Sequence, residues 1–252
     1  MVHFVGAGSG AVDLITVRGA GLLEKADVII YAGSLVNPGL LEYAHKDCRI
    51  YDSALMDLGE IMDVIRENAD REVVRLHTGD PSIYGAIKEQ MDILENEGIP
   101  YDVCPGVSSM SGAAASLKAE YTLPGVSQSV IITRAEGRTA VPEGQGLSEL
   151  AKHGSTMVIF LSAGLSDKVS AELMEGGYAQ DTPAAVVYKA TWPQEKIIRT
   201  TLGRLPQAMK EERIDKTALI IVGDVLDTDY ELSRLYDKDF STGFRNAGNN
   251  RE

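Results

Sequence analysis

The stretch EVVRLHTGDPSIYG, residues 72–85, decides how the chain around it folds. It begins as an apolar run typical of a buried strand and stops at a Thr-Gly-Asp-Pro turn. Asp80 and Pro81 suit the N-cap and the first position of a helix, and the apolar spacing from Ile83 predicts a helix over residues 83–97. Helix capping alone explains Asp80 and Pro81, so this stretch does not by itself indicate a ligand.

The same alternation of strand and helix runs through the first half of the chain. Five apolar runs of strand length each precede a segment with helical spacing, which is the pattern of βαβ units and of a mainly parallel sheet. The expected strands are HFV at 3–5, DVIIYA at 27–32, CRIYD at 48–52, EVVRL at 72–76 and YDVCP at 101–105, and the expected helices are 17–25, 35–45, 58–69, 83–97 and 107–119.

The second half of the chain is richer in strands, which indicates a mixed sheet. The helical pattern ends at a Pro-Gly pair, and five strand-like runs follow with fewer helices between them. We therefore expect an α/β protein of two domains, residues 1–123 and 124–252, whose polar tail from residue 227 packs its apolar side chains before it frays. The expected elements of the second domain are strands at 129–133, 156–162, 184–188, 196–202 and 217–222 and helices at 165–175 and 205–211.

Composition limits the classes of function. The chain has 252 residues, of which 44% are hydrophobic, and no apolar run reaches the roughly 18 residues of a membrane-spanning helix. Its amino terminus enters a strand directly, which predicts a cytoplasmic protein. The net charge of −13, without a basic stripe, disfavours nucleic acid or an anionic membrane as a partner. Two cysteines and four histidines without ligand spacing predict neither a disulfide nor a metal site.

A glycine-rich turn, VGAGSGAVD at residues 5–13, follows the first strand. It satisfies the loose dinucleotide pattern G-x-G-x-x-A, in which glycines let backbone approach a phosphate; a purely structural tight turn is the alternative. The next strand ends at Ala32 and Gly33, where an NAD-binding protein needs an acidic residue for the ribose. An NAD-dependent oxidoreductase is therefore the disfavoured interpretation.

Three further motifs place small or basic residues at the ends of strands. CPGVSSMSGAAAS, residues 104–116, lets a ligand lie against backbone, or equally lets a helix pack closely on a sheet. ITRAEGRT, residues 132–139, carries Arg134 and Arg138, which suit bidentate binding of carboxylates but also occur in solvated loops. VVYKATWPQEKIIR, residues 186–199, brings a lysine and the only tryptophan, which equally suits a core. Because open α/β sheets bind ligands at the carboxyl ends of their strands, the motifs together predict a cleft between two domains.

Together these motifs resemble the tetrapyrrole methylases, enzymes of corrin and sirohaem synthesis that use S-adenosylmethionine. The resemblance covers about residues 2–244, and TGDPSIYG and TRAEGRT are its most specific parts; YAGSLVNP, IFLSA and TALIIVG add to it. It implies a homodimer of two-domain α/β chains that hold the cofactor in the cleft between the domains. Within the family, the resemblance is strongest to the methylation of carbon 11 of precorrin-4 or its cobalt form, in cobalamin biosynthesis, and it does not separate these two substrates.

The resemblance also implies roles for single residues. The implied S-adenosylmethionine-binding residues are Thr78, Gly79, Asp80, Ile83, Tyr84, Ser108, Ser109, Leu161, Ala190 and Ala218. The implied or expected tetrapyrrole-binding residues are Gly8, Ser9 and Gly10 of the glycine-rich turn, with Arg134, Arg138 and Lys189 orienting the carboxylates of the substrate. No catalytic residue is assigned, because an in-line methyl transfer depends mainly on positioning.

The chain departs from the family at two places. Where the family has GAGPGDP, this chain has Ser9, Ala11 and Val12, so the acidic residue of that loop is missing and Asp13 is the nearest carboxylate. Ala32 stands near an aspartate of the uroporphyrinogen methylases, which favours carbon 11 methylation. The alternatives are a methylase acting at another position of a corrin or uroporphyrinogen ring and a non-catalytic module that binds S-adenosylmethionine.

Overall fold

The structure, a computed structural model, describes residues 1–247, and the chain divides into two compact units. The expected domain division between residues 123 and 124 stays a prediction. The first unit comprises Met1–Lys118, Val186–Ile198 and Ile214–Leu219, and the second comprises Ala119–Ala185, Arg199–Arg213 and the residues from Ile220 on.

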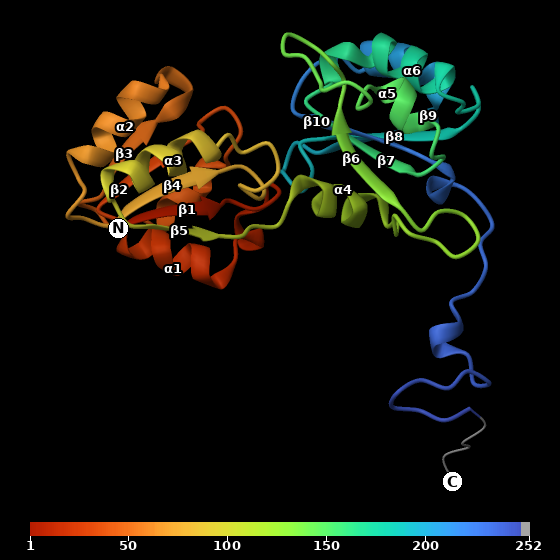
Figure 1. Ribbon diagram of the computed structural model, residues 1–252, viewed down its shortest axis with the longest axis horizontal. Helices are drawn as coiled ribbons and strands as arrows, with labels where there is room; N and C mark the ends of the chain where they lie inside the picture. The colour runs from red at the N-terminus through yellow and green to blue at the C-terminus, as the bar shows by residue number, and fades with distance from the viewer. Residues whose placement is uncertain (248–252) are drawn as a thin grey trace. The chain divides into compact units, whose positions relative to one another are not determined.

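A five-stranded sheet lies at the centre of the first unit (Figure 1). Its strand order is β3-β2-β4-β1-β5, and every neighbouring pair is parallel, as the sequence predicts. Buried valine and isoleucine fit a parallel sheet that is covered on both faces. The strands are β1 (Val2–Gly6), β2 (Val28–Tyr31), β3 (Arg49–Asp52), β4 (Val73–His77) and β5 (Tyr101–Cys104).

Helices cover both faces of this sheet, with α1 on one face and α2 and α3 on the other (Figure 1). On the α1 face, Leu23 packs in one buried cluster with Ile29 and Leu76. On the opposite face, Ile65 and Leu94 belong to a second buried cluster. The helices of the first unit are α1 (Val17–Lys25), α2 (Leu58–Arg66), α3 (Lys88–Glu97) and α4 (Ser109–Leu117).

The helix expected over residues 83–97 begins only at Lys88, so that prediction was wrong for its first turn. The chain folds back too tightly for a helix, since a Cβ on Gly85 would lie 2.1 Å from the carbonyl oxygen of Pro81. Tyr84 has a φ of 56°, whereas a right-handed helix needs a negative φ. The apolar spacing that predicts the helix therefore also covers residues 83–87, which do not form a helix.

The helix expected over residues 35–45 is also different, because the segment forms the 3-10 helix η2 (Pro38–Tyr43). Asn37 caps it by accepting a hydrogen bond from the Gly39 N–H at 3.0 Å. Proline followed by glycine leaves little α-helical propensity in the first turn, which accounts for the tighter and shorter helix.

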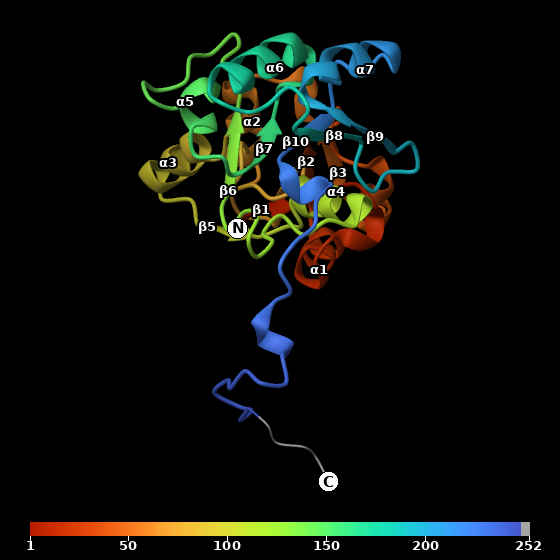
Figure 2. The same cartoon turned by 90° about the vertical axis from the view of Figure 1, so that its right-hand side faces the viewer.

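The second sheet is mixed, with the order β6-β7-β10-β8-β9. β6 runs parallel to β7, and β10 runs antiparallel to it, which confirms the expected mixed sheet. Helices α5, α6 and α7 lie on one face of this sheet (Figures 1 and 2). The elements are β6 (Val130–Arg134), β7 (Thr156–Phe160), β8 (Pro183–Tyr188), β9 (Lys196–Thr201), β10 (Ala218–Val222), α5 (Leu147–Ala151), α6 (Ser166–Glu175) and α7 (Leu205–Glu211).

The tail from residue 227 differs from its prediction. The described part of the tail holds one 3-10 helix, η7, in an otherwise irregular segment (Figure 2). The side chains of Leu232, Tyr236 and Phe244 are exposed, so the expected packing of the tail was wrong for them.

Short 3-10 helices join several elements of the fold. Besides η2, they are η1 (Val12–Leu14), η3 (Ser53–Leu55), η4 (Ala163–Leu165), η5 (Leu202–Arg204), η6 (Asp224–Leu226) and η7 (Arg234–Tyr236).

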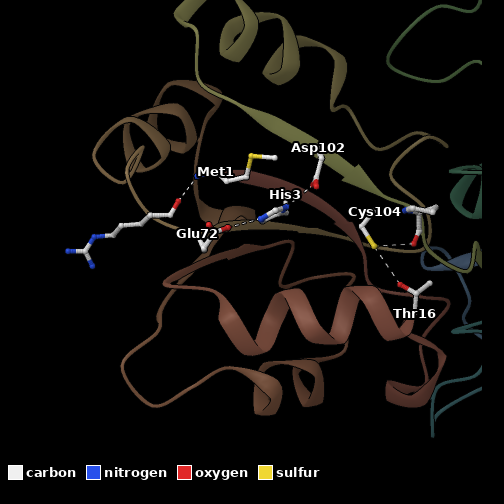
Figure 3. Close-up of polar contacts among 8 residues, drawn as sticks. Met1, His3, Thr16, Glu72, Asp102 and Cys104 are labelled. Carbon is white, nitrogen blue, oxygen red and sulfur yellow. Dashed lines mark hydrogen bonds and ion pairs between the residues drawn. The ribbon is translucent and has the colours of Figure 1, made fainter.

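A polar cluster ties three parts of the first sheet together at the amino-terminal ends of its strands (Figure 3). The buried His3 of β1 has Nδ1 2.7 Å from a carboxylate oxygen of Asp102 and Nε2 2.8 Å from one of Glu72. The cluster joins β1 to β5 and to the residue that precedes β4.

At the other end of β5, the Cys104 sulfur lies 3.6 Å from the hydroxyl of Thr16.

The last residue of β4, His77, is a buried base. Its ring lies at a tilt against Phe4, with centroids 5.9 Å apart, and its Nε2 has no hydrogen-bond partner among residues 1–247. Burial, and after it the charge of Arg75, lowers the pKa of His77 from 6.5 to about 3. The folded chain therefore keeps this ring neutral in mildly acidic solution, where the unfolded chain protonates it.

Stability should consequently fall as the pH drops from 6.5 toward about 3, because only the unfolded chain gains this proton. Between about pH 7.5 and 5.5, His77 should cost about 1.4 kcal/mol of unfolding free energy, which His77→Leu should abolish. Urea unfolding at both pH values measures the difference. His153→Leu, at an exposed position, is the control, and an unchanged pH dependence in His77→Leu would contradict the assignment.

Candidate functional site

Three turns meet at the carboxyl end of the first sheet, because β4, β1 and β5 are adjacent and parallel. They are the glycine loop after β1, residues 6–12, the TGDP turn after β4, residues 78–81, and the Pro-Gly turn after β5, residues 105–108. Their meeting follows from the strand order alone.

Glycines allow the three turns to touch through their backbones. A Cβ on Gly6 would lie 2.5 Å from the Cα of Gly106 and 2.6 Å from the carbonyl oxygen of Gly79. Gly8 and Gly79 also exchange two backbone hydrogen bonds, of 3.3 and 2.9 Å. At Gly6 and Gly106 no side chain fits without moving backbone, so glycine is required by the packing there.

The carboxylate of Asp80 fastens the TGDP turn to the Pro-Gly turn. Its Oδ2 accepts a hydrogen bond from the Gly106 N–H at 2.8 Å, and its Oδ1 accepts from the Ser82 N–H at 2.8 Å and from the Ser82 hydroxyl. Burial raises the pKa of Asp80, but the hydrogen bonds from Ser82 and Gly106 outweigh it and hold the pKa below its usual value. Asp80 thus stays charged and closes an Asx turn instead of capping the expected helix.

The TGDP turn lies beside the first turn of α4. Ser108 caps that helix by accepting a hydrogen bond from the Met110 N–H at 3.4 Å. A Cβ on Gly79, which has a φ of 61°, would lie 3.4 Å from the nitrogen of Ser109. Thr78 is exposed next to it. The structure therefore brings the predicted residues of the TGDP and Pro-Gly turns together.

Ile83 and Tyr84 lie in the turns between Pro81 and α3. The Ile83 N–H donates to the carbonyl oxygen of Asp80 at 3.2 Å, which keeps it next to the TGDP turn. The side chain of Tyr84 is 44% exposed. Both predicted residues thus follow the site directly, on an irregular backbone and not on a helix.

The loop after β8, residues 189–195, lies against the glycine loop within the first unit. A Cβ on Gly10 would lie 2.1 Å from the Trp192 ring and 2.5 Å from the carbonyl oxygen of Ala190. The ammonium of Lys189 lies 5.1 Å from the centroid of the Trp192 ring, a distance typical of a cation–π contact, and 5.6 Å from that of Tyr188. Lys189 and Ala190 are therefore close to the predicted glycine residues despite their distance along the chain.

Ala218 belongs to the same unit and opens β10. The preceding residue, Thr217, accepts a hydrogen bond at its carbonyl oxygen from the Lys189 N–H at 2.9 Å. This bond connects the start of β10 to the loop 189–195.

Arg134 and Arg138 lie in the second unit, where they differ in their contacts. The guanidinium of Arg134 donates to the carbonyl oxygens of Ala135, Thr139 and Ala140, at 3.2, 3.1 and 2.7 Å. It therefore closes the loop that carries Arg138, whose own side chain is exposed. The sequence pattern did not distinguish these two arginines.

Leu161 stands in the turn after β7. Its side chain is 69% exposed, and its φ is 53°. The buried hydroxyl of Ser162 accepts a hydrogen bond from the Ala135 N–H at 2.8 Å and donates to the carbonyl oxygen of Phe160 at 2.6 Å. These bonds hold the two loops after β6 and β7 together and fix the backbone beside Leu161.

Polar residues that the sequence reasoning missed also contact the glycine loop. Asn37 donates from Nδ2 to the carbonyl oxygen of Gly10 at 2.8 Å, and the hydroxyl of Thr191 contacts Ser9 and Ala11. The Asn-Pro pair marks Asn37 as a helix cap, but nothing in the sequence signals the contacts of Thr191. No three His, Cys, Asp or Glu side chains of the described chain form a possible metal site, and none of its helices is long and apolar enough to span a membrane.

Comparison with known proteins places the chain in a family. A sequence model described as Tetrapyrrole (Corrin/Porphyrin) Methylases matches residues 1–206. The chain belongs to the tetrapyrrole methylases. The cobalt-precorrin-4 C(11)-methyltransferase of Methanocaldococcus jannaschii is 58% identical to it over 249 residues, which cover 98% of this chain and 96% of that protein. The resemblance seen in the sequence is confirmed, and the chain is a methyltransferase.

Two solved structures resemble this methylase. A cobalt precorrin-4 methyltransferase of cobalamin biosynthesis is 48% identical, with a TM-score of 0.86 over 90% of this chain and 96% of that one. A uroporphyrin-III C-methyltransferase from Thermus thermophilus, complexed with S-adenyl homocysteine, is 25% identical, with a TM-score of 0.77 over 89% of this chain and 98% of that one. The expected α/β architecture, with one parallel and one mixed sheet, is thereby confirmed.

The role of Asp80 in joining two turns predicts a loss of stability in Asp80→Asn. The two carboxylate oxygens of Asp80 accept hydrogen bonds from different N–H groups, but asparagine has only one oxygen that can accept. Its amide nitrogen would face the N–H of Gly106 or of Ser82 and leave that donor unpaired, which should cost about 1–3 kcal/mol of unfolding free energy. Asp92→Asn is the control, because Asp92 pairs with the exposed Lys88 and the loss of such a surface pair should cost much less stability. Urea unfolding at neutral pH compares them, and equal losses would show that Asp80 is not a fastening residue.

Proposed function

We propose that this methylase transfers a methyl group from S-adenosylmethionine to carbon 11 of precorrin-4 in cobalamin biosynthesis, and that the cobalt form is its substrate. The observation that carries the proposal is the 58% identity, over nearly the whole of both chains, to an enzyme named for that reaction. The solved structure with a TM-score of 0.86 is also named a cobalt precorrin-4 methyltransferase, which supports the cobalt form of precorrin-4 as the substrate.

S-adenosylmethionine is the proposed methyl donor. The relative that holds S-adenyl homocysteine supports it, because that compound is what remains after the methyl group leaves. A Cβ on Gly79 would meet its nearest neighbours only at 3.4 Å and beyond, whereas Gly6 and Gly106 have no such space. Gly79 is buried against the first turn of α4, and the exposed Thr78 beside it gives this proposed cofactor cradle its access to solvent. The proposed cofactor-binding residues are Thr78, Gly79, Asp80, Ile83, Tyr84, Ser108, Ser109, Leu161, Ala190 and Ala218.

The proposed mechanism asks little chemistry of the protein itself. When bound, S-adenosylmethionine would supply an electrophilic methyl group on a sulfonium and, once the methyl group is transferred, leave as S-adenosylhomocysteine. The chain holds the two reactants in line, and such positioning is worth roughly 7–11 kcal/mol in the best intramolecular models. Asp80 is not a general base in this scheme, because its carboxylate is fully engaged with Gly106 and Ser82.

The carboxylates of the substrate are proposed to meet Arg138 and Lys189, with Gly8, Ser9 and Gly10 lining the ring. Arg138 is exposed and Lys189 is half-buried beside aromatic rings, and neither forms a salt bridge with an acidic side chain among the described residues, so both charges are available to an anion. Arg134 contributes by holding the loop of Arg138, since its own guanidinium binds three carbonyl oxygens. An Arg138→Ala variant with an unchanged KM for the tetrapyrrole would remove Arg138 from this role.

A homodimer and a cytoplasmic location complete the proposal. Both come from the family resemblance. Sedimentation equilibrium tests the dimer, and a monomer at micromolar concentration would contradict it.

Anaerobic incubation with carbon-13 methyl-labelled S-adenosylmethionine tests the function directly. Cobalt-precorrin-4 and metal-free precorrin-4 are compared, and NMR of the product locates the label. We expect a single labelled methyl group at carbon 11, formed faster on the cobalt form. A label at another ring carbon would identify a different methylase, and binding of the cofactor without transfer to either substrate would favour the non-catalytic module.

Alanine substitutions at two glycines with the same backbone conformation distinguish an effect on cofactor binding from an effect on stability. Gly79 and Gly98 have φ angles of 61° and 68°, so alanine at either should cost about 1–2 kcal/mol of stability. Gly98 ends α3 with no neighbouring atom within 4 Å of its Cβ position. We expect only Gly79→Ala to weaken S-adenosylhomocysteine binding, by about tenfold or more, in calorimetry. Wild-type affinity in a folded Gly79→Ala would refute the proposed cradle.

A further inference from the structure

Thr191 stands at the centre of a polar network that joins the loop 189–195 to the glycine loop. Its hydroxyl accepts a hydrogen bond from the Ala11 N–H at 2.9 Å and lies 3.1 Å from the hydroxyl of Ser9, with which it shares another. Ser9 is 7% exposed, so this second contact is largely shielded from water. One hydroxyl group thus serves two residues of the loop that the proposed function assigns to the tetrapyrrole.

The carboxylate of Glu195 holds Thr191 from the other side. Its Oε2 accepts hydrogen bonds from the Thr191 N–H and from the hydroxyl of Ser116 in α4, both at 2.6 Å. Thr191 has a φ of 66°, a conformation that is strained for a β-branched residue and persists only where its surroundings impose it. Glu195 imposes it here and so aims the hydroxyl at the glycine loop.

The glycine loop packs closely against α4 and against the loop 189–195. A Cβ on Gly112 of α4 would lie 2.6 Å from the Cβ of Ser9 and 3.2 Å from a methyl carbon of Thr191. The Trp192 ring occupies the corresponding space at Gly10. Three segments, α4, the glycine loop and the loop 189–195, therefore fit together around the Thr191 side chain.

We propose that Thr191 is a positioning residue for the tetrapyrrole, which fixes the glycine loop in its receiving conformation and is itself fixed by Glu195. This inference rests on the proposed function, in which Gly8, Ser9 and Gly10 line the ring of the substrate. Thr191 acts through Ser9 and Ala11 and does not contact the reacting atoms. Its loss should therefore weaken substrate binding while the chemistry of the bound complex remains.

The first test does not need the substrate, because Trp192 is the only tryptophan and packs on the glycine loop. Thr191→Val keeps the shape and removes the hydroxyl, so acrylamide should quench the fluorescence of the variant about twofold more strongly as the loop loosens. Thr191→Ser should quench like the wild type. Thr217→Val is the control for a valine at a positive φ, since the Thr217 hydroxyl has no hydrogen bond among the described residues, and it should not change quenching.

The second test separates KM from kcat in the labelled methyl-transfer assay. Thr191→Val should raise the KM for cobalt-precorrin-4 about tenfold, as expected for one lost hydrogen bond with an unpaired N–H, and leave kcat within about twofold. Thr191→Ser should restore the wild-type KM. If valine prevents folding, Thr191→Gly also removes the hydroxyl and relieves the strained φ, and should give the same rise in KM.

The outcomes decide between this inference and the function beneath it. Wild-type KM in Thr191→Val, or a fall in kcat at constant KM, would overturn the positioning role. Unchanged quenching in Thr191→Val would overturn the claim that its hydroxyl fixes the loop. If the wild-type protein transfers no methyl group to cobalt-precorrin-4, the proposed function fails, and the quenching test still decides whether Thr191 fixes the glycine loop.

Discussion

The close approach of three backbone turns at the carboxyl end of the first sheet is the constraint on which the site depends. Gly6 and Gly106 lie so close to each other, and to the carbonyl oxygen of Gly79, that neither could carry a side chain. The parallel order β4-β1-β5 brings these turns together, and Asp80 then uses its charge to fasten two of them. A ligand at this place must consequently be recognised by backbone groups and by the residues that border them.

Backbone strain accompanies the predicted site residues. Tyr84, Leu161 and Lys189 all have positive φ angles, although none is glycine, and Thr191 beside Lys189 has one too. Such conformations cost on the order of 1–3 kcal/mol each and persist where surrounding contacts over-determine them. At Thr191 those contacts are visible, since Glu195 and Ser9 bond to its two polar groups. The strain thus has a structural cause that is independent of the family resemblance.

The sequence predicted the elements of the fold better than the contacts of the site. All ten strands of the described residues lie where apolar runs indicate them, because burial in a sheet requires such runs. The start of α3 was misplaced, because apolar spacing extends through a turn that Gly85 permits. The motif around Arg134 indicated a cation at a strand end, but it did not indicate the hydrogen bonds from Arg134 to three carbonyl oxygens of its own loop. Thr191 escaped notice because its partners are 180 and 182 residues away along the chain.

Two of the charged residues expected to meet a ligand, Asp80 and Arg134, also bond to backbone groups of the site. Arg134, Arg138 and Lys189 all stay candidate cations for an anionic substrate. The net charge of −13 opposes the approach of a polycarboxylate only weakly at physiological salt, where charges beyond about 8 Å are largely screened. The rings of Tyr188 and Trp192 restrict where the ammonium of Lys189 lies. The overall charge of the chain therefore does not argue against an anionic substrate.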